Sequence, residues 1–378
     1  MKNILIITTV SGFLQKFESE NVRLLKETGY NVIYCAGDSY PAYLYEDGCY
    51  EKMGVDFCPV SIDKSPFHIK NNFKAFKELE EIVRKENIAA IHCHTPVGGL
   101  LGRLLGKKYG LKVIYTAHGF HFYKGAGAFN NLVYGGIERW LAGYTDAVVV
   151  INSEDFEAAC AFKLKKGGRV YKIPGVGLDT EKFRPVSDEE RKKARKQAGI
   201  SDDEFLLVSV GELNKNKNHE TVIRALKLLG EENVRCVVCG DGPKRKALEN
   251  LIMEPDLKKK AALLGYVQDV REILAAADAF VFPSIREGLG MAALEAMAMG
   301  IPVIAADNRG SREYMKDGIN GYVCPGNSKE EYAAAVRKIM KLSKEELAQM
   351  KDACRKTSQA FSKDAAGKIM KEVYSNHL

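Results

Sequence analysis

The sequence contains no uninterrupted apolar run close to the roughly 20 residues that a membrane-spanning helix needs, which excludes such a helix. The apolar start at residues 4–10 is short and is not followed by the small-x-small cleavage site of a signal peptide. The nine cysteines are an odd number scattered over 378 residues, so they do not form a disulfide framework. These absences predict free thiols and a cytoplasmic protein.

Metal-binding motifs are also scarce. Cys236 and Cys239 have the spacing of zinc ligands, but they lie in an apolar run where a strand would turn them to opposite faces. His92 and His94 end another strand-like segment and have no evident partner pair. No Asp-x-Asp motif accompanies the site residues described below. We therefore expect no metal ion and no other cofactor.

The chain is longer than the roughly 250–300 residues at which single hydrophobic cores stop growing, so two domains are expected. Strand-like apolar runs alternate with amphipathic helical stretches, which predicts the α/β class with parallel sheets wrapped by helices. A Pro/Gly-rich stretch at residues 173–179 interrupts the series. We predict a first domain at residues 1–177 and a second at residues 178–357, with a helix at about 358–378 that packs on either one.

The net charge is +7, and Lys and Arg gather in short clusters at residues 103–108, 163–169, 191–196 and 258–260. Taken singly, each cluster is explained by a solvated helix face. Taken together, they favour an anionic partner, either a lipid surface or a pyrophosphate-linked acceptor. No nucleic-acid-binding motif accompanies them, so we do not expect nucleic acid as a partner.

The most informative segment is residues 280–302, in which a strand, a glycine-containing loop and an Ala/Met-rich helix follow one another. The helix is expected to begin near Gly290 and Met291, where unpaired backbone N–H groups suit a diphosphate. Glu287 precedes this helix and Glu295 lies within it. A carboxylate among Ala and Met needs a partner, and either ribose hydroxyls or a buried cation or N–H group would serve.

This segment resembles the signature of glycosyltransferase family 4, with Glu287-x7-Glu295 set between Phe-Pro-Ser and Ala-Met-Ala-Met-Gly-Ile-Pro-Val. Further matching blocks fall in the family's order at residues 209–219, 239–243, 264–267 and 317–322. The resemblance covers essentially the whole chain. It implies a GT-B fold, in which two Rossmann-like domains face each other across a cleft, with a first domain that binds the acceptor and a second that binds a nucleotide sugar.

The resemblance also implies roles for individual residues. In the family, Glu295 would hold the ribose and Glu287 the donor sugar, while Lys217 and the N–H groups of Gly290 and Met291 would face the diphosphate. The other donor-binding positions that it implies are Gly12, Gly211, Asn214 and Val267.

Two further positions concern the chemistry. His118, within Thr116-Ala117-His118-Gly119, resembles the family's histidine beside the reacting sugar, so His118, Glu287 and Lys217 are the expected catalytic residues. Glu212 departs from the family, which commonly has Arg there, and a carboxylate cannot donate to phosphate. Lys215, Asn214 or a residue of the first domain would have to compensate.

The implied reaction is transfer of a sugar, with retained anomeric configuration, from a nucleoside diphosphate donor that we expect to be UDP-linked. The acceptor would be a lipid-linked or saccharide molecule of capsular or exopolysaccharide synthesis, and the enzyme would contact the inner face of the cytoplasmic membrane peripherally. Three alternatives stay open: a nucleotide-sugar epimerase of similar fold, a two-domain sugar-binding protein, and an NAD-dependent oxidoreductase. The last is suggested by Gly288-x-Gly290-x-x-Ala293 followed by Asp307.

Overall fold

The computed structural model describes residues 2–38, 48–230 and 232–378. The chain divides into two compact units. The first comprises Met1–Gly177 together with Lys363–Leu378, and the second comprises Leu178–Ser362. The last helix of the chain therefore belongs to the first unit, and each unit is described separately below.

The first unit is built from alternating strands and helices, as the hydrophobic patterning predicts. Its elements are β1 (Lys2–Ile7), η1 (Leu14–Glu18), α1 (Ser19–Glu27), β2 (Tyr30–Ala36), α2 (Cys49–Met53), β3 (Val55–Pro59), α3 (Ile69–Lys85), β4 (Ile88–His94), α4 (Pro96–Tyr109), β5 (Lys112–Ala117), α5 (Ala128–Ala142), β6 (Ala147–Val150), α6 (Ser153–Cys160), β7 (Arg169–Lys172) and α14 (Lys363–His377).

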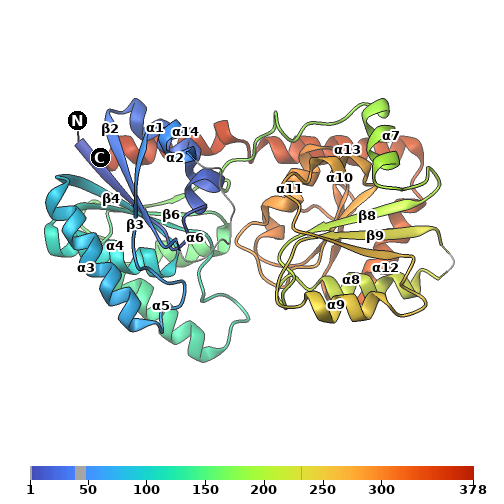
Figure 1. Ribbon diagram of the computed structural model, residues 1–378, viewed down its shortest axis with the longest axis horizontal. Coiled ribbons are helices and arrows are strands. Elements are labelled where there is room, and N and C mark those ends of the chain that lie inside the picture. The colour runs from blue at the N-terminus through green and yellow to red at the C-terminus, as the bar shows by residue number, and fades with distance from the viewer. Residues whose placement is uncertain (1, 39–47, 231) are drawn as a thin grey trace. The chain divides into compact units, whose positions relative to one another are not determined.

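The seven strands of this unit form one parallel sheet in the order β3-β2-β1-β4-β5-β6-β7. Helices cover both faces of the sheet, with α1 and α14 packed against each other on one face and α3, α4 and α5 on the other (Figure 1). The strand order changes direction between β1 and β4. Open α/β sheets bind ligands beyond the carboxyl ends of their strands at such a point.

Two buried ionic groups stabilise the first unit. Arg103 of α4 is 1% exposed, and its guanidinium donates to the Glu138 carboxylate at 2.7 Å while it lies 3.9 Å from the centre of the Tyr115 ring. Asp146, just before β6, accepts hydrogen bonds from the Lys165 amine at 2.9 Å, from the Lys112 amine at 3.1 Å and from the Val113 amide. Each buried charge therefore has a partner, as burial demands.

The second unit repeats the architecture. Its elements are α7 (Asp188–Gln197), β8 (Phe205–Val210), α8 (His219–Leu228), β9 (Val234–Cys239), α9 (Arg245–Ile252), β10 (Ala261–Gly265), α10 (Arg271–Ala276), β11 (Ala279–Phe282), α11 (Met291–Ala298), β12 (Val303–Ala306), η2 (Ser311–Glu313), β13 (Gly321–Cys324), α12 (Lys329–Met340) and α13 (Lys344–Gln359).

Its six strands are also parallel, in the order β10-β9-β8-β11-β12-β13, and the direction of the series changes between β8 and β11. Helices α8, α9 and α12 cover one face of the sheet, and α10, α11 and α13 cover the other (Figure 1). Helices α7, α12 and α13 each begin with a capping box, in which Ser187, Ser328 or Ser343 exchanges hydrogen bonds with a glutamate three residues later.

The predicted α/β class with two doubly wound parallel sheets is confirmed, and several local predictions need correction. The strand expected at residues 90–92 is longer and contains His92 and His94 as β4. The edge strand β3 was not predicted. The helix expected at residues 18–28 is preceded by the π-helix η1, which ends at Glu18.

Candidate active site

The candidate donor site lies in the second unit at the carboxyl ends of β8 and β11, the two strands that flank the change of direction in the sheet. The loop after β8 contains Gly211, Asn214 and Lys217, and the loop after β11 contains Glu287. Asn216 joins the two loops, because its backbone oxygen accepts from the Ile285 amide at 2.8 Å and its side chain donates to the Arg286 carbonyl at 2.9 Å.

Lys217 and Glu287, which the sequence placed 70 positions apart, form an ion pair in this site. The Lys217 ammonium donates to Oε1 of Glu287 at 2.6 Å, and the two side chains are 23% and 13% exposed. The ammonium also lies 5.3 Å from the centre of the Phe282 ring. The Asn214 side chain accepts from the Lys217 amide at 2.9 Å, which fixes the turn that carries the lysine.

The N-terminus of α11 opens beside this pair. Gly290 is the N-cap, with φ of 97°, a conformation that few residues other than glycine adopt. A methyl group at Gly290 would lie 2.6 Å from the Phe282 ring and 3.0 Å from the Tyr314 hydroxyl. Tyr314 is 2% exposed, and its hydroxyl has no hydrogen-bond partner among the residues that the structure describes. Sequence reasoning missed this buried donor, which lies next to the amide groups of the helix.

The remaining predicted donor residues surround the same strand ends. Glu295 lies in α11, partly buried, one turn beyond Met291. Val267 follows β10, partly buried. Glu212 is exposed and accepts from the Asn214 side chain at 2.9 Å, while Lys215 is exposed on the same loop.

Glycines allow the loops of this site to approach each other closely. Gly240, after β9, has φ of 151°, and a methyl group there would lie 1.9 Å from the Gly211 carbonyl oxygen. Gly310 likewise lies close to Glu287, since a methyl group on Gly310 would lie 2.9 Å from Cβ of Glu287. Arg309, 7% exposed, donates through Nε to the Glu287 carbonyl at 3.2 Å. Both the loop after β8 and the position of Glu287 therefore depend on small or hydrogen-bonded neighbours.

The first unit contains a second polar cluster at the carboxyl ends of its own central strands. His118 follows β5, and its Nε2 lies 3.2 Å from Nδ1 of His94, the last residue of β4. Oε1 of Glu18, at the end of η1, lies 3.4 Å from His94 Nδ1 and 3.8 Å from His118 Nε2. His94 was expected to have no partner, and the structure corrects this expectation. Gly12 lies buried in the turn that precedes η1.

Burial controls the protonation of this cluster. Burial raises the pKa of Glu18 to about 8, although the hydrogen bond from Asn21 at 2.5 Å lowers it. Burial lowers the pKa of His118 to about 4 and holds the pKa of His94 well below its usual range. The histidines are therefore neutral at neutral pH and present lone pairs, and the carboxyl group is largely protonated.

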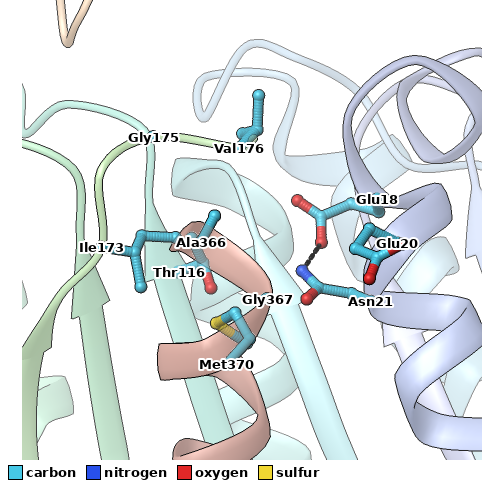
Figure 2. Close-up of a pocket in the computed structure, with 10 residues that line it drawn as sticks. All are labelled: Glu18, Glu20, Asn21, Thr116, Ile173, Gly175, Val176, Ala366, Gly367 and Met370. Atoms are coloured by element: carbon cyan, nitrogen blue, oxygen red, sulfur yellow. Dashed lines mark hydrogen bonds between the residues drawn. The ribbon is translucent and has the colours of Figure 1, made fainter. Parts of the chain in front are cut away.

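Two cavities in the first unit reach this cluster. The smaller cavity is lined by Glu18, Asn21 and Thr116, together with Met370 of α14. Figure 2 shows that one carboxyl oxygen of Glu18 is hydrogen-bonded to Asn21 and that the other oxygen points away from Asn21. The larger, of about 160 Å³, is lined by His118 together with polar and aromatic residues. Those lining residues are Thr95, Pro96, Tyr115, Gly119, Phe120, His121, Tyr134 and Glu138.

The dinucleotide fingerprint considered from the sequence does not fit its expected context. Strand β11 ends at Phe282, so residues 283–287 separate it from Gly288, whereas the fingerprint requires glycines directly after a strand. Within the described part of the chain, no helix is long and apolar enough to cross a membrane.

Two family models match the chain in succession. Residues 20–180 match "Glycosyltransferase Family 4", and residues 190–357 match "Glycosyl transferases group 1". EpsD of Bacillus subtilis, which carries the name of a glycosyltransferase, is 38% identical over 100% of this chain and 97% of its own length. The UDP-Gal:alpha-D-GlcNAc-diphosphoundecaprenol alpha-1,3-galactosyltransferase of Escherichia coli is 28% identical over 89% of this chain and 87% of its own.

Solved structures agree on the fold. HepE of Anabaena, solved in complex with UDP-glucose, has a TM-score of 0.80 at 18% identity over 99% of this chain and 100% of its own. WaaG, a glycosyltransferase involved in lipopolysaccharide biosynthesis, has a TM-score of 0.77 at 17% identity over 98% and 99% of the two chains. The two parallel α/β units thus have the GT-B fold, and the chain belongs to the glycosyltransferases of the family 4 and group 1 type.

Proposed function

We propose that this glycosyltransferase transfers a sugar, with retained anomeric configuration, from a UDP-sugar to a lipid-linked or saccharide acceptor in the synthesis of a cell-surface polysaccharide. The observation that carries the proposal is the Lys217–Glu287 pair beside the N-terminus of α11, because it sets a cation, a carboxylate and free amide groups together. The names of the relatives support the donor and acceptor classes, since one acts with UDP-galactose on a diphosphoundecaprenol-linked sugar.

Each group at the site suits one part of such a donor. The amides of Gly290 and Met291 and the Lys217 ammonium would receive the diphosphate, since a helix N-terminus and a cation both stabilise its charge. Glu295, one turn along the helix, would accept from the ribose hydroxyls. Glu287 would accept from hydroxyls of the sugar once the diphosphate competes for Lys217. Gly211, Asn214 and Val267 would complete the wall around the donor.

The chemistry requires that the bond between the anomeric carbon and the diphosphate oxygen breaks while the acceptor oxygen bonds to that carbon. The acceptor proton would pass to the departing diphosphate on the same face of the sugar. Negative charge grows on the diphosphate during this step, so Lys217 and the helix N-terminus act mainly by electrostatic stabilisation. We therefore propose that no metal ion is needed at the diphosphate. The roles of Gly12 beside the phosphate and of His118 beside the sugar stay predictions.

Glu295→Ala tests the donor site directly. Binding of UDP should weaken about tenfold or more when a charge-assisted hydrogen bond to the ribose is lost, measured by calorimetry. Glu345→Ala, an exposed first-turn glutamate of α13, is the control and should bind UDP normally. An unchanged affinity of Glu295→Ala for UDP would contradict the proposed donor site. Proton NMR of the glycosylated product then tests stereochemistry, and an inverted anomeric centre would contradict retention alone.

The lipid-linked acceptor class gains support from helix α5 of the first unit. Phe129, Leu132 and Trp140 lie on it at helical spacing and are 77%, 75% and 51% exposed. The Trp140 ring contacts the Tyr144 ring edge-on, and the Lys107 ammonium lies 4.2 Å from the centre of that ring. An apolar stripe bordered by a cation suits the surface of an anionic membrane. We propose that this face of α5 rests on such a surface.

The membrane proposal can be tested without a label, because Trp140 is the single tryptophan of the chain. Vesicles containing phosphatidylglycerol should shift its fluorescence to shorter wavelength, whereas vesicles of pure phosphatidylcholine should shift it much less. Leu132→Glu should abolish the shift and cosedimentation, and Leu228→Glu, at an exposed leucine of the second unit, should leave both unchanged. Loss of binding in both variants, or in neither, would contradict the proposed face.

A further inference from the structure

The cluster formed by Glu18, His94 and His118 has the donor types and the spacing of a transition-metal site. The three facing atoms are one carboxylate oxygen and two imidazole nitrogens, and they all lie within 4.8 Å of one another. Two histidines and one glutamate are a ligand set that Zn²⁺ takes in proteins, with a water in the fourth position. The residues come from three different elements, η1, β4 and the loop after β5.

The distances fit one ion among the three donors. Ligands bonded to tetrahedral Zn²⁺ at about 2.0–2.1 Å lie about 3.4 Å apart. Here the separations are 3.2 Å between His94 Nδ1 and His118 Nε2, 3.4 Å between His94 Nδ1 and Glu18 Oε1, and 3.8 Å between His118 Nε2 and Glu18 Oε1. A hydrogen bond between the two histidines explains the 3.2 Å separation of their nitrogens, but it does not require Glu18 Oε1 to lie close to both rings.

Neighbouring groups position Glu18 and the two imidazole rings, while Nε2 of His94 is buried without a hydrogen-bond partner among the residues that the structure describes. The Asn21 side chain donates to Oε2 of Glu18, which leaves Oε1 directed at the histidines. The Phe13 ring meets the His118 ring edge-on at 5.0 Å. On the other side, the His94 ring packs on His92 at 4.2 Å, and the His92 ring nitrogens are bonded to Thr116 and Tyr374.

Access and charge are also compatible with an ion. The His118 side chain is 20% exposed and lines the larger cavity, of about 160 Å³, which has space for a water ligand. A divalent ion would displace the proton of the Glu18 carboxyl group, and the resulting carboxylate would offset part of the charge of the ion. We infer that Glu18, His94 and His118 bind one divalent transition-metal ion of the Zn²⁺ class. Because the ion takes the Nε2 lone pair of His118, it would withdraw this residue from the proposed sugar transfer and inhibit it, a consequence that rests on the proposed function.

The test uses the full chain, stripped of metal by a chelator and titrated with Co²⁺ and Zn²⁺ at neutral pH. We expect one ion per chain, a visible Co²⁺ spectrum without a sulfur-to-cobalt charge-transfer band, and a melting temperature raised by Zn²⁺. His118→Asn and His94→Gln should weaken binding by at least about tenfold. His121→Asn is the matched control, because His121 lines the same cavity as His118 but packs against the Tyr134 ring, and this variant should bind the metal normally.

Three results would overturn the inference: no stoichiometric binding, equal loss of affinity in His121→Asn, or a spectrum that reports thiolate ligands. Any of them leaves the three side chains as a hydrogen-bonded group. UDP binding by calorimetry, with and without Zn²⁺, separates this result from the donor proposal. Apart from Gly12 and His118, the proposed donor residues lie in the second unit, so UDP should bind equally in both conditions even where the metal inference fails.

Discussion

Lys217→Met is the sharpest test of how the donor site works, because the lysine is already paired in the free protein. A charge-assisted hydrogen bond to phosphate contributes about 1.5–3 kcal/mol, which would be a roughly 10- to 150-fold loss of affinity. The diphosphate must first compete with Glu287, which holds the ammonium at 2.6 Å, so part of this free energy is offset. We therefore expect UDP to bind about tenfold more weakly to Lys217→Met, near the lower limit of that range.

Calorimetry with three ligands isolates the phosphate contribution. The loss should be full for UDP, smaller for UMP and absent for uridine, since the lysine is expected at the diphosphate. Lys215→Met is the matched control, because Lys215 is an exposed lysine of the same loop. Equal losses in the two lysine variants would mean that general positive charge, and not the paired lysine, attracts the nucleotide. That result would refute the reasoning.

Glu287→Gln completes the test, because it should change the affinities for UDP and for a UDP-sugar in different directions. Removing the carboxylate charge frees Lys217 from its partner, so UDP should bind as tightly as before or more tightly. A UDP-sugar should lose affinity relative to UDP, because the amide accepts less strongly from sugar hydroxyls than a carboxylate does. A parallel weakening of both ligands would show that Glu287 maintains the loop and does not contact the sugar.

Other changes test the structure that supports the two units. Arg103→Met should lower the free energy of unfolding, measured in urea, by about 3–5 kcal/mol because it leaves the Glu138 charge without its cation. The double variant Arg103→Met, Glu138→Leu should recover most of this loss. Burial alone would raise the pKa of Asp146, but its lysine and amide hydrogen bonds hold it below the usual value. Asp146 should therefore stabilise the protein above pH about 4. The difference in melting temperature between the unchanged protein and Asp146→Asn should vanish as the pH falls through the lowered pKa of Asp146. Gly240→Ala should displace Gly211 and weaken both stability and UDP binding.

Much of the proposed donor site could be predicted because its residues are close in sequence to strand ends. Glu287 and Gly290 lie in the loop after β11, and Lys217 lies in the loop after β8, so strand patterning alone places them at one edge of the sheet. The pairing of Lys217 with Glu287 needed the sheet order, since it depends on β8 and β11 being neighbours. Tyr314 could not be found in this way. It follows the short helix η2, and nothing in its local sequence places its hydroxyl beside Gly290.

The first unit shows a different limit. The edge strand β3 escaped prediction because Val55–Pro59 is short and contains Asp56 and a terminal proline, which weaken its pattern. His94 and His118 end neighbouring parallel strands, so their proximity was available from the order of the sheet once that order was known. Within one strand, residues two positions apart such as His92 and His94 share a face, but only the neighbouring strand brings His118 to His94.

Glu18 could not have been added to that cluster from the sequence, because its position depends on an irregular helix. Residues Leu14–Glu18 form a π-helix, whose hydrogen bonds reach one residue further along the chain than those of an α-helix, and the pattern predicted a helix only over residues 18–28. Each residue of an α-helix turns the chain by about 100°, so a regular turn at the same place would rotate Glu18 out of the contact with His94 and His118. A local widening of the backbone, and not the residue type alone, therefore decides whether a carboxyl group meets the two histidines.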